Sequence, residues 1–311
     1  MLPNLLQSRN MWGRWESGIY TRNFPIDGLV LYLPLYQNPD YVLLNGTGIA
    51  SGAPVVLLTP GNNTITVTQA GTFTITLPTG VTGTATSGTA TITGSPQSLV
   101  GGLNTITAEG TGNFTVSVPI IVSKEGLAHL CTVTGATWGT TGRYFDGSDL
   151  IDLGTNSVLD LTGSFSLCVW LNPDNLINPR YVYGKDSFQT AGILLGLTTV
   201  GAIDFYTSQD SAFQQTKSSN GVIAAATWAM VGVSREGTDV KLYKNGVVQT
   251  EATSGVHQNP ASSAHSSILG AGGDLEANKF LGSIGEFWLY SGKVLAASEF
   301  QNIYDNTKWR Y

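Results

Sequence analysis

The segment Trp228–Thr250, WAMVGVSREGTDVKLYKNGVVQT, constrains the fold more than any other part of the chain. It reads as three short strands joined by tight turns at Arg235–Thr238 and at Asn245-Gly246. Asn-Gly between alternating strands is a strong hairpin signal, because both residues of such a turn need a positive φ. Alternation then places Val240, Leu242 and Val247 on one face and Lys241, Tyr243 and Gln249 on the other. The segment therefore predicts a meander in a half-buried antiparallel sheet.

The rest of the chain has a composition typical of strands and turns. Only 12% of its residues are charged, against roughly 25% in typical soluble domains. The net charge of −6 argues against binding to nucleic acid, which needs basic patches. No run of about 18 apolar residues is present, so we expect no membrane span. Its two cysteines, Cys131 and Cys168, lie in apolar runs and are expected to be buried free thiols.

Strand patterns continue from residue 127 to residue 292, with turn signals about every 8 to 12 residues. This spacing is typical of an all-β sandwich. Near the end of the chain, Phe300, Ile303 and Tyr304 recur at helical spacing and predict a short helix over Ala296–Asp305. We therefore predict an all-β fold, a two-sheet antiparallel sandwich with a short C-terminal helix.

A second unit interrupts this pattern between residues 40 and 121. Glu109 is the only charged residue between Tyr41 and Ile121, and the segment holds an internal repeat. Residues 61–78 align without gaps to residues 102–119, and each copy reads as a strand, a glycine-containing turn and a second strand. We predict a small β-sandwich or β-barrel module in which paired hairpins stack to bury their apolar residues.

The apolar strand LVLYLPLYQ, residues 29–37, precedes this module, and Pro34 marks it as an edge or bulged strand. It belongs in character with the strands after residue 122. The predicted organisation is therefore an N-terminal arm (1–24), a discontinuous larger domain (25–39 and 122–311) and an inserted module (40–121). Insertions of this kind are tolerated at exposed loops.

Four motifs of the larger domain occur in an order that resembles a known superfamily. They are FDG at 145–147, SFSLCVWLNP at 164–173, LYKNG at 242–246 and FLGSIGEFWLYSGKVLAASEFQNIY at 280–304. Together they resemble the concanavalin A-like, laminin-G-like jelly rolls. The resemblance covers about residues 126–311 plus the strand near 28–37, and it implies a two-sheet jelly roll. It implies no single function, since that superfamily includes lectins, adhesion modules, glycosidases and capsid-associated domains.

Many laminin-G-like domains bind calcium at a loop rim, so the resemblance raises this ion as a cofactor. Asp146, Asp149 and Asp152 offer oxygen ligands at every third position, with Asp149 the best single candidate. The alternative is structural: Asp146 with the following glycine forms a turn by its own chemistry, and alternation sends Asp149 and Asp152 to opposite faces. No other cofactor is expected.

Enzymatic activity is not expected, and no catalytic residues are assigned. Glycoside hydrolysis needs two carboxylates at close range, whereas Glu286 and Asp204 each stand alone in their strands and read as single polar-face residues. His257 and His265 lie in a loop rich in glycine, serine and asparagine. They read more readily as solvated loop residues than as a metal pair or part of a catalytic group.

Glycan binding would use aromatic rings and amides at a loop or groove. Residues 207–220, TSQDSAFQQTKSSN, read as a long polar loop with one isolated phenylalanine. The candidate ligand-binding residues in and beside it are Tyr206, Gln209, Asp210, Phe213 and Gln214. Other aromatics that could supply a ring, such as Tyr181, read first as core residues, as most aromatics of a sandwich are.

Two functions remain open, both non-enzymatic. The first is a decoration or fibre-like protein of a phage-type virion, located on the virion surface and exposing the jelly roll for attachment. The alternative is a carbohydrate-binding or adhesion module of an extracellular or cell-surface protein. The first is favoured by the nearly uncharged repeat module, by the lack of a signal-peptide pattern at the N-terminus and by the aromatic arm. Through Trp12, Trp15 and Tyr20 that arm is expected to contact another copy of the chain or a shell protein.

Overall fold

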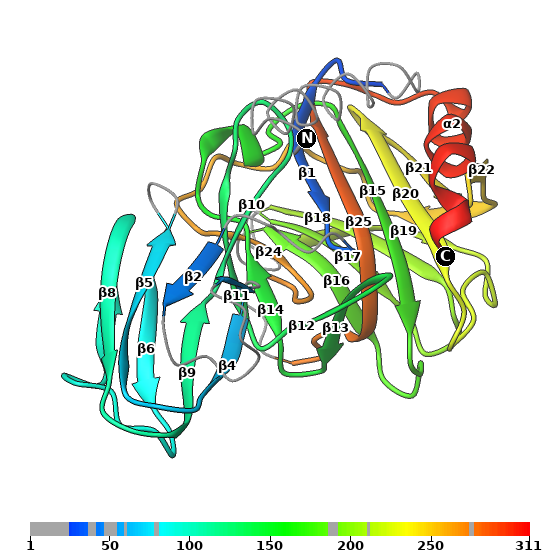
Figure 1. Cartoon of the computed structure of the whole chain (residues 1–311). Helices are drawn as coiled ribbons and strands as arrows, with labels where there is room; N and C mark the ends of the chain where they lie inside the picture. Colours follow the sequence, from blue (N-terminus) through cyan, green and yellow to red (C-terminus); the bar gives the residue numbers. More distant parts are fainter. Residues whose placement is uncertain are drawn as a thin grey trace, which may run out of the picture.

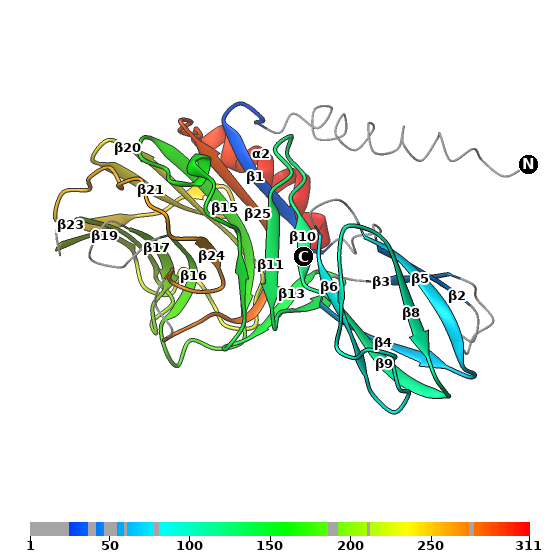
Figure 2. The same cartoon turned by 90° about the vertical axis from the view of Figure 1, so that its left-hand side faces the viewer.

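The computed structural model describes residues 25–36, 42–46, 55–58, 61–77, 81–185, 192–209, 212–273 and 277–311. Strands dominate this part of the chain, and one α-helix lies near its C-terminal end. The predicted all-β class and the short C-terminal helix are both confirmed. Two large antiparallel sheets lie face to face, and two smaller sheets form a separate pair beside them (Figures 1 and 2).

The first large sheet has eight strands. In spatial order they are β12 (Thr137–Gly139), β13 (Gly142–Asp146), β25 (Leu281–Ser291), β15 (Phe165–Pro173), β20 (Ala229–Glu236), β21 (Asp239–Lys244) and β22 (Val247–Val248), with β1 (Leu29–Pro34) paired to β25. β1 and β13 pair with successive parts of β25, and the register of β1 shifts between Leu29 and Leu31. β1 has no other partner strand among the described residues, so Pro34 lies in a bulged edge strand as predicted.

The second large sheet has nine strands. Their order is β10 (Ile120–Val122), β11 (Leu130–Thr134), β14 (Leu150–Asp152), β24 (Ser267–Leu269), β16 (Arg180–Lys185), β17 (Ile193–Leu197), β18 (Ile203–Gln209), β19 (Ala212–Ser218) and β23 (Glu251–Ser254). A short 3₁₀ helix, η1 (Ser157–Leu159), follows β14. The two large sheets are the layers of a sandwich (Figure 2).

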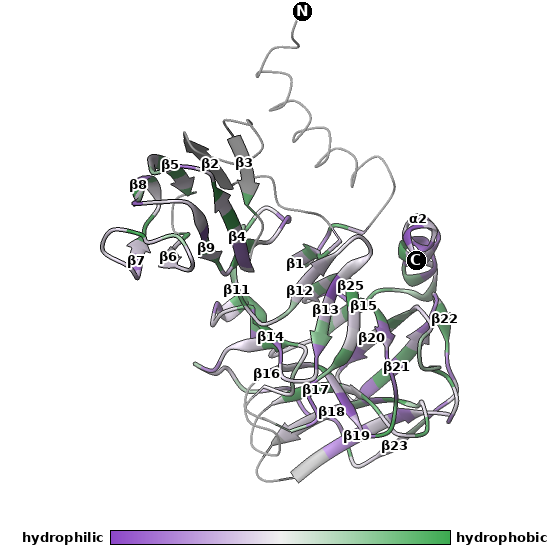
Figure 3. Ribbon diagram, turned by 60° about the horizontal axis from the view of Figure 1, so that its bottom comes forward, coloured by the Kyte–Doolittle hydropathy of each residue, from purple (hydrophilic) through white to green (hydrophobic). Residues whose placement is uncertain are grey.

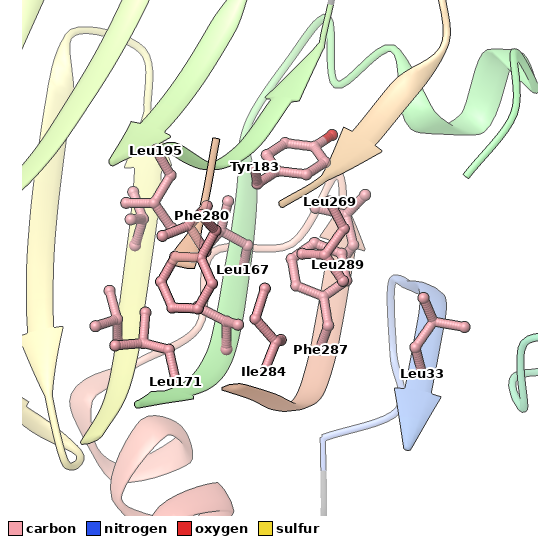
Figure 4. Close-up of a cluster of buried hydrophobic side chains, with 14 of the residues drawn as sticks. Leu33, Leu167, Leu171, Tyr183, Leu195, Leu269, Phe280, Ile284, Phe287 and Leu289 are labelled. Atoms are coloured by element: carbon pink, nitrogen blue, oxygen red, sulfur yellow. The ribbon is translucent and has the colours of Figure 1, made fainter. Parts of the chain in front are cut away.

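The main core fills the space between these two sheets. Alternate residues of β15, such as Leu167 and Leu171, point inward and meet Tyr183 and Leu195 of the opposite sheet (Figure 4). Phe280 completes this layer and packs edge-on against Phe145, with ring centroids 6.2 Å apart. The alternation of side chains along each strand thus places apolar residues on both inner faces of the sandwich.

The outer face of the eight-stranded sheet is covered by α2 (Ala297–Thr307) and the 3₁₀ helix η2 (Lys308–Arg310). Phe300 of α2 stacks on Tyr243 with 3.9 Å between ring centroids. A Cβ at Gly232 would lie 2.5 Å from the Phe300 ring, so this strand position must be glycine for the helix to approach. The apolar stripe predicted for the helix therefore contacts the sheet.

The meander folds as the turn residues predict. Asn245 and Gly246 have φ values of 51° and 82°, and Asn245 Oδ1 accepts a hydrogen bond from Met230 N at 2.9 Å. Figure 3 shows polar and apolar residues alternating along β21. Val247 pairs with Lys244 and so shares the face of Val240 and Leu242 as expected, but it is 57% exposed on the two-residue edge strand β22 and is not part of the core.

Replacing Gly246 with alanine should lower the free energy of unfolding by about 2 kcal/mol, because a positive φ is strained for alanine and the new Cβ needs space. That Cβ would lie 2.6 Å from the Cα of Gln301 in α2. Gly237 is the matched control: its φ is 60°, but nothing lies within 4 Å of its ideal Cβ. Urea denaturation should show the larger loss for Gly246→Ala, and equal losses would contradict the close approach of the turn to α2.

The segment between the two parts of the jelly roll forms two four-stranded sheets. Their orders are β3 (Val55–Leu58), β2 (Val42–Gly46), β5 (Gly71–Leu77), β8 (Gly102–Ala108), and β4 (Gly61–Val67), β9 (Gly112–Val118), β6 (Gly83–Ser87), β7 (Gln97–Leu99). A separate core lies between them, in which Phe73 and Phe114 meet with ring centroids 5.7 Å apart. The exact domain boundaries, at residues 39 and 122, stay a prediction.

The repeat pairs differently from the expected paired hairpins. The two strands of each copy, β4 with β5 and β8 with β9, lie in different sheets. Each strand pairs with a strand of the other copy instead, β4 with β9 and β5 with β8. The prediction of hairpins is wrong because a glycine turn can cross from one sheet to the other as readily as it can close a hairpin. Burying Phe73 and Phe114 against each other favours the crossing.

Among the described residues, no helix has the length and apolar character needed to cross a lipid bilayer.

Candidate functional site

The predicted ligand-binding loop is a pair of strands. Residues 203–209 and 212–218 form the antiparallel strands β18 and β19 of the nine-stranded sheet. The loop interpretation of residues 207–220 is therefore wrong. Both strands are rich in serine, glutamine and threonine, because the outer face is polar and part of the inner face also carries hydroxyl groups. The two-residue alternation of a strand is therefore not visible as a change between apolar and polar residues.

The strands place the candidate residues on opposite faces. Tyr206 lies opposite Gln215 and shares the outer face with it, whereas Gln214 points to the interior. Gln214 is 5% exposed, and its Oε1 accepts a hydrogen bond from Thr207 Oγ1 at 2.9 Å. Tyr206 and Gln214 therefore cannot contact one ligand together. Asp210 lies outside the described residues, as do the side chains of Gln209 and Phe213.

On the outer face of β18 and β19, the side chains of Asp204, Tyr206 and Gln215 are hydrogen-bonded to one another. Asp204 Oδ2 accepts from the Tyr206 hydroxyl at 2.7 Å, and Asp204 Oδ1 accepts from Gln215 Nε2, also at 2.7 Å. Gln215 Nε2 donates in addition to the Tyr206 oxygen at 2.6 Å. The three side chains fix one another's positions. They therefore form a pre-organised polar surface rather than a set of mobile groups.

Burial shapes the electrostatics of this group. Asp204 is 8% exposed, and burial raises the pKa of its carboxyl, although hydrogen bonds from Tyr206 and Gln215 and the positive charge of Lys217 lower it in part. Burial and the neighbouring Asp204 raise the pKa of the Tyr206 hydroxyl. The tyrosine therefore remains a neutral donor at physiological pH.

Two further side chains extend this surface across the sheet. Tyr181 of β16, Gly196 of β17, Asp204 of β18 and Lys217 of β19 occupy one cross-strand row. A Cβ at Gly196 would lie 3.2 Å from Cδ1 of Tyr181, so the tyrosine ring lies beside a strand position without a side chain. We call Tyr181, Asp204, Tyr206, Gln215 and Lys217 the outer-face cluster.

Sequence reasoning found only part of this cluster. Tyr206 was among the predicted ligand-binding residues, while Gln215 and Lys217 were not. One pattern in the sequence does indicate this face: apolar Ile203 and Phe205 alternate with polar Asp204 and Tyr206. Such alternation assigns every second residue of a strand to the same face. Tyr181 is half-buried on the outer face and is not a core residue.

The three aspartates raised as calcium ligands are each engaged in local hydrogen bonds. Asp146 Oδ1 accepts from Ser148 N and Oγ, Asp149 Oδ2 accepts from Asp146 N at 2.9 Å, and Asp152 Oδ1 accepts from Gly154 N at 2.8 Å. Within the described ranges, no three His, Cys, Asp or Glu side chains gather closely enough to hold a metal ion. The calcium site stays a prediction.

Other predicted residues have varied outcomes. Trp12, Trp15 and Tyr20, the predicted partner contacts, lie outside the described residues. Cys131 and Cys168 are buried and free, as expected.

His257 is buried rather than solvated, being 1% exposed. Its Nδ1 and Nε2 lie 2.8 Å from the hydroxyls of Thr207 and Thr216 on the inner face of β18 and β19. Thr207 donates its single hydroxyl proton to Gln214, so it must accept from Nδ1–H, which leaves Nε2 to accept from Thr216. His257 is therefore a neutral imidazole with one defined tautomer. The prediction failed because its partners come from strands distant in sequence.

Glu286 is not a surface residue of a polar face. It is completely buried, and both of its oxygens lie within 2.8 Å of Arg310 Nη1. The hydroxyls of Tyr32 and Tyr311 also donate to it, at 2.7 and 3.2 Å. These contacts join the C-terminal segment to β25 and β1. The role of Glu286 in this arrangement is therefore to hold the fold together.

The architecture agrees with the superfamily whose model matches the chain. The family model of the concanavalin A-like lectin/glucanases superfamily matches residues 145–299. The two large sheets form a concanavalin A-like jelly roll. The resemblance found in the sequence motifs is thereby confirmed, since three of the four motifs lie wholly within the matched range and the fourth lies mostly within it. No curated protein matches the chain.

Several solved structures are similar to the chain at low identity. The botulinum neurotoxin serotype D binding domain is 16% identical with a TM-score of 0.46, covering 60% of this chain and 48% of that chain. The CBM40 of Ruminococcus gnavus IT-sialidase, bound to alpha2,3 sialyllactose, is 12% identical with a TM-score of 0.45, covering 55% and 96%. Domain 4 of AbnA, an extracellular arabinanase from Geobacillus stearothermophilus, in complex with arabinotriose, is 20% identical with a TM-score of 0.44, covering 58% and 91%. The chain thus spans about half the length of the neurotoxin binding domain.

Proposed function

We propose that this protein is a non-enzymatic carbohydrate-binding or adhesion module of an extracellular or cell-surface protein. The outer-face cluster is the observation that carries this proposal. Sugar recognition needs aromatic rings for the apolar faces of a pyranose and fixed polar groups for its hydroxyls. Tyr181 and Tyr206 supply the rings, and the bonded group of Asp204 and Gln215 supplies polar atoms at fixed positions.

The cluster is better suited to binding than to chemistry. Both Asp204 oxygens already accept hydrogen bonds, and hydrolysis of a glycoside needs a second carboxylate within roughly 5 to 9.5 Å. None of the other described members of the cluster is an acid. Lectin function also agrees with the jelly-roll superfamily, whose members include lectins among other functions.

A decoration role on a virion, the first expectation from the sequence, gains no support from the fold or from the comparisons. Its predicted partner contacts, Trp12, Trp15 and Tyr20, lie outside the described residues, and the role stays a prediction. A decorating protein could bind glycans through the same face, so the two functions are compatible.

Glycan binding should weaken when the Tyr181 ring is removed from the outer-face cluster. We expect the wild-type protein to retain at least one class of oligosaccharide on a glycan array, and Tyr181→Ala to weaken that binding about tenfold, which corresponds to about 1.4 kcal/mol. Isothermal titration calorimetry measures the change. Tyr144→Ala is the matched control, because Tyr144 is 39% exposed but lies on the eight-stranded sheet. A wild-type protein that binds no glycan, or a Tyr181→Ala protein that binds like wild type, would contradict the proposal.

A further inference from the structure

Most polar groups of the outer-face cluster are already occupied by one another. Both oxygens of Asp204 accept hydrogen bonds, and Gln215 Nε2 donates to Asp204 and to Tyr206. The carboxylate therefore contributes to the shape and rigidity of the face, and as an acceptor it offers a ligand no donor. A ligand that binds here must find its charged partner elsewhere in the cluster.

Lys217 is that partner. It lies directly opposite Asp204 on β19 and is partly exposed. In the part of the chain that the structure describes, its ammonium group makes no hydrogen bond and no ion pair within 4 Å. Four other lysines pair with carboxylates: Lys185, Lys241, Lys293 and Lys308. The cluster thus presents three unused donors and a positive charge.

The position of Lys217 suits an extended ligand. Tyr181 and Lys217 lie on one cross-strand row, three strand intervals apart, or about 14 Å at the usual strand spacing. Gly196 lies between them, and its missing side chain lets the Tyr181 ring lie close to the strand backbone. A short oligosaccharide lying along this row can stack one ring on Tyr181 and place a substituent at Lys217.

We infer that the ligand of this face is an acidic glycan, whose carboxylate or sulfate group pairs with Lys217 while a sugar ring stacks on Tyr181. This inference rests on the proposed carbohydrate-binding function and adds the class of glycan to it. The charge-assisted hydrogen bond favours an anion over a neutral hydroxyl at that end of the row. Lys217 is therefore a specificity-determining residue, and Tyr181 supplies affinity for acidic and neutral glycans alike.

The test compares matched acidic and neutral ligands by calorimetry. Oligogalacturonates against their methyl esters isolate the carboxylate, and chondroitin sulfate against desulfated chondroitin isolates the sulfate. We expect the acidic member of at least one pair to bind about tenfold more tightly, and this preference to shrink between 50 and 200 mM salt because the pair is near the surface.

Variants separate the charge from the rest of the site. Lys217→Gln should abolish the preference while leaving binding of the neutral ligand unchanged, and Lys217→Arg should retain it. Lys244→Gln is the control, since Lys244 is also partly exposed but lies on the eight-stranded sheet. If neutral glycans bind as tightly as acidic ones, or if Lys217→Gln keeps the preference, the inference fails while the proposed function stands. If no glycan of either kind binds, the proposed function fails as well.

Discussion

Replacing Arg310 with methionine is expected to lower the free energy of unfolding of the jelly roll by about 3 to 5 kcal/mol at pH 7, because a buried carboxylate loses the one cationic partner it has among the described residues. Glu286 is completely buried, and its pair with Arg310 Nη1 is 2.7 Å long. The two tyrosine hydroxyls that remain cannot neutralise the charge. Tryptophan fluorescence during urea denaturation measures the loss, since none of the seven tryptophans lies between residues 40 and 121.

The size of this loss should depend on pH. Burial already raises the pKa of Glu286, and removal of Arg310 raises it further. A carboxyl whose pKa is higher in the folded than in the unfolded state costs stability as pH rises through that window, so Arg310→Met should be least damaging at low pH. An Arg310→Met penalty that is equal at pH 5 and pH 8 would show that the loss comes from packing instead.

Two further variants distinguish pairing from packing. Glu286→Gln leaves a cation whose guanidinium still lies against the rings of Tyr36 and Trp309, at 4.7 and 4.5 Å from their centroids, so we expect a smaller loss. The double variant Glu286→Leu with Arg310→Met should recover most of the stability, because replacing a whole buried ion pair with apolar groups is often close to neutral. A double variant as unstable as Arg310→Met alone would contradict the role of the unpaired charge.

Local chemistry explains which parts of the fold were predictable. Asn245-Gly246 defines its turn through the φ angles of two neighbouring residues, and Phe300 with Ile303 defines a helix face within a single turn. The jelly-roll class followed from four such local motifs in order. None of these features depends on which distant strand lies alongside.

The failures all concern non-local partners. The repeat copies exchange strands because Phe73 and Phe114 meet across the two small sheets, and no residue within one copy indicates that. The sequence of β19 was interpreted as a loop because its inward-facing residues are polar. They are buried and hydrogen-bonded to other polar groups, as Gln214 is to Thr207. The candidate site was therefore predicted at the right hairpin but with residues from both faces.

His257 shows how such a non-local contact affects stability. Burial, aided by the positive charge of Arg235, lowers the pKa of its imidazole from 6.5 to about 4. Below pH 6.5 the unfolded chain gains a proton that the folded protein does not bind until about pH 4. Stability should therefore fall as pH decreases through this window, by about 3 kcal/mol in all, because each pKa unit corresponds to about 1.4 kcal/mol.

The loss on acidification should disappear when the titrating group is removed. His257→Gln keeps an amide donor and acceptor between Thr207 and Thr216 but has no proton to gain, so we expect its unfolding free energy to be lower at pH 7 and to change less between pH 6.5 and pH 4. His265→Gln is the control, because His265 is exposed and should keep the wild-type pH dependence. Urea denaturation at four pH values measures both slopes. If His257→Gln and wild type lose stability in parallel, the buried imidazole is not the group whose titration makes the fold acid-sensitive.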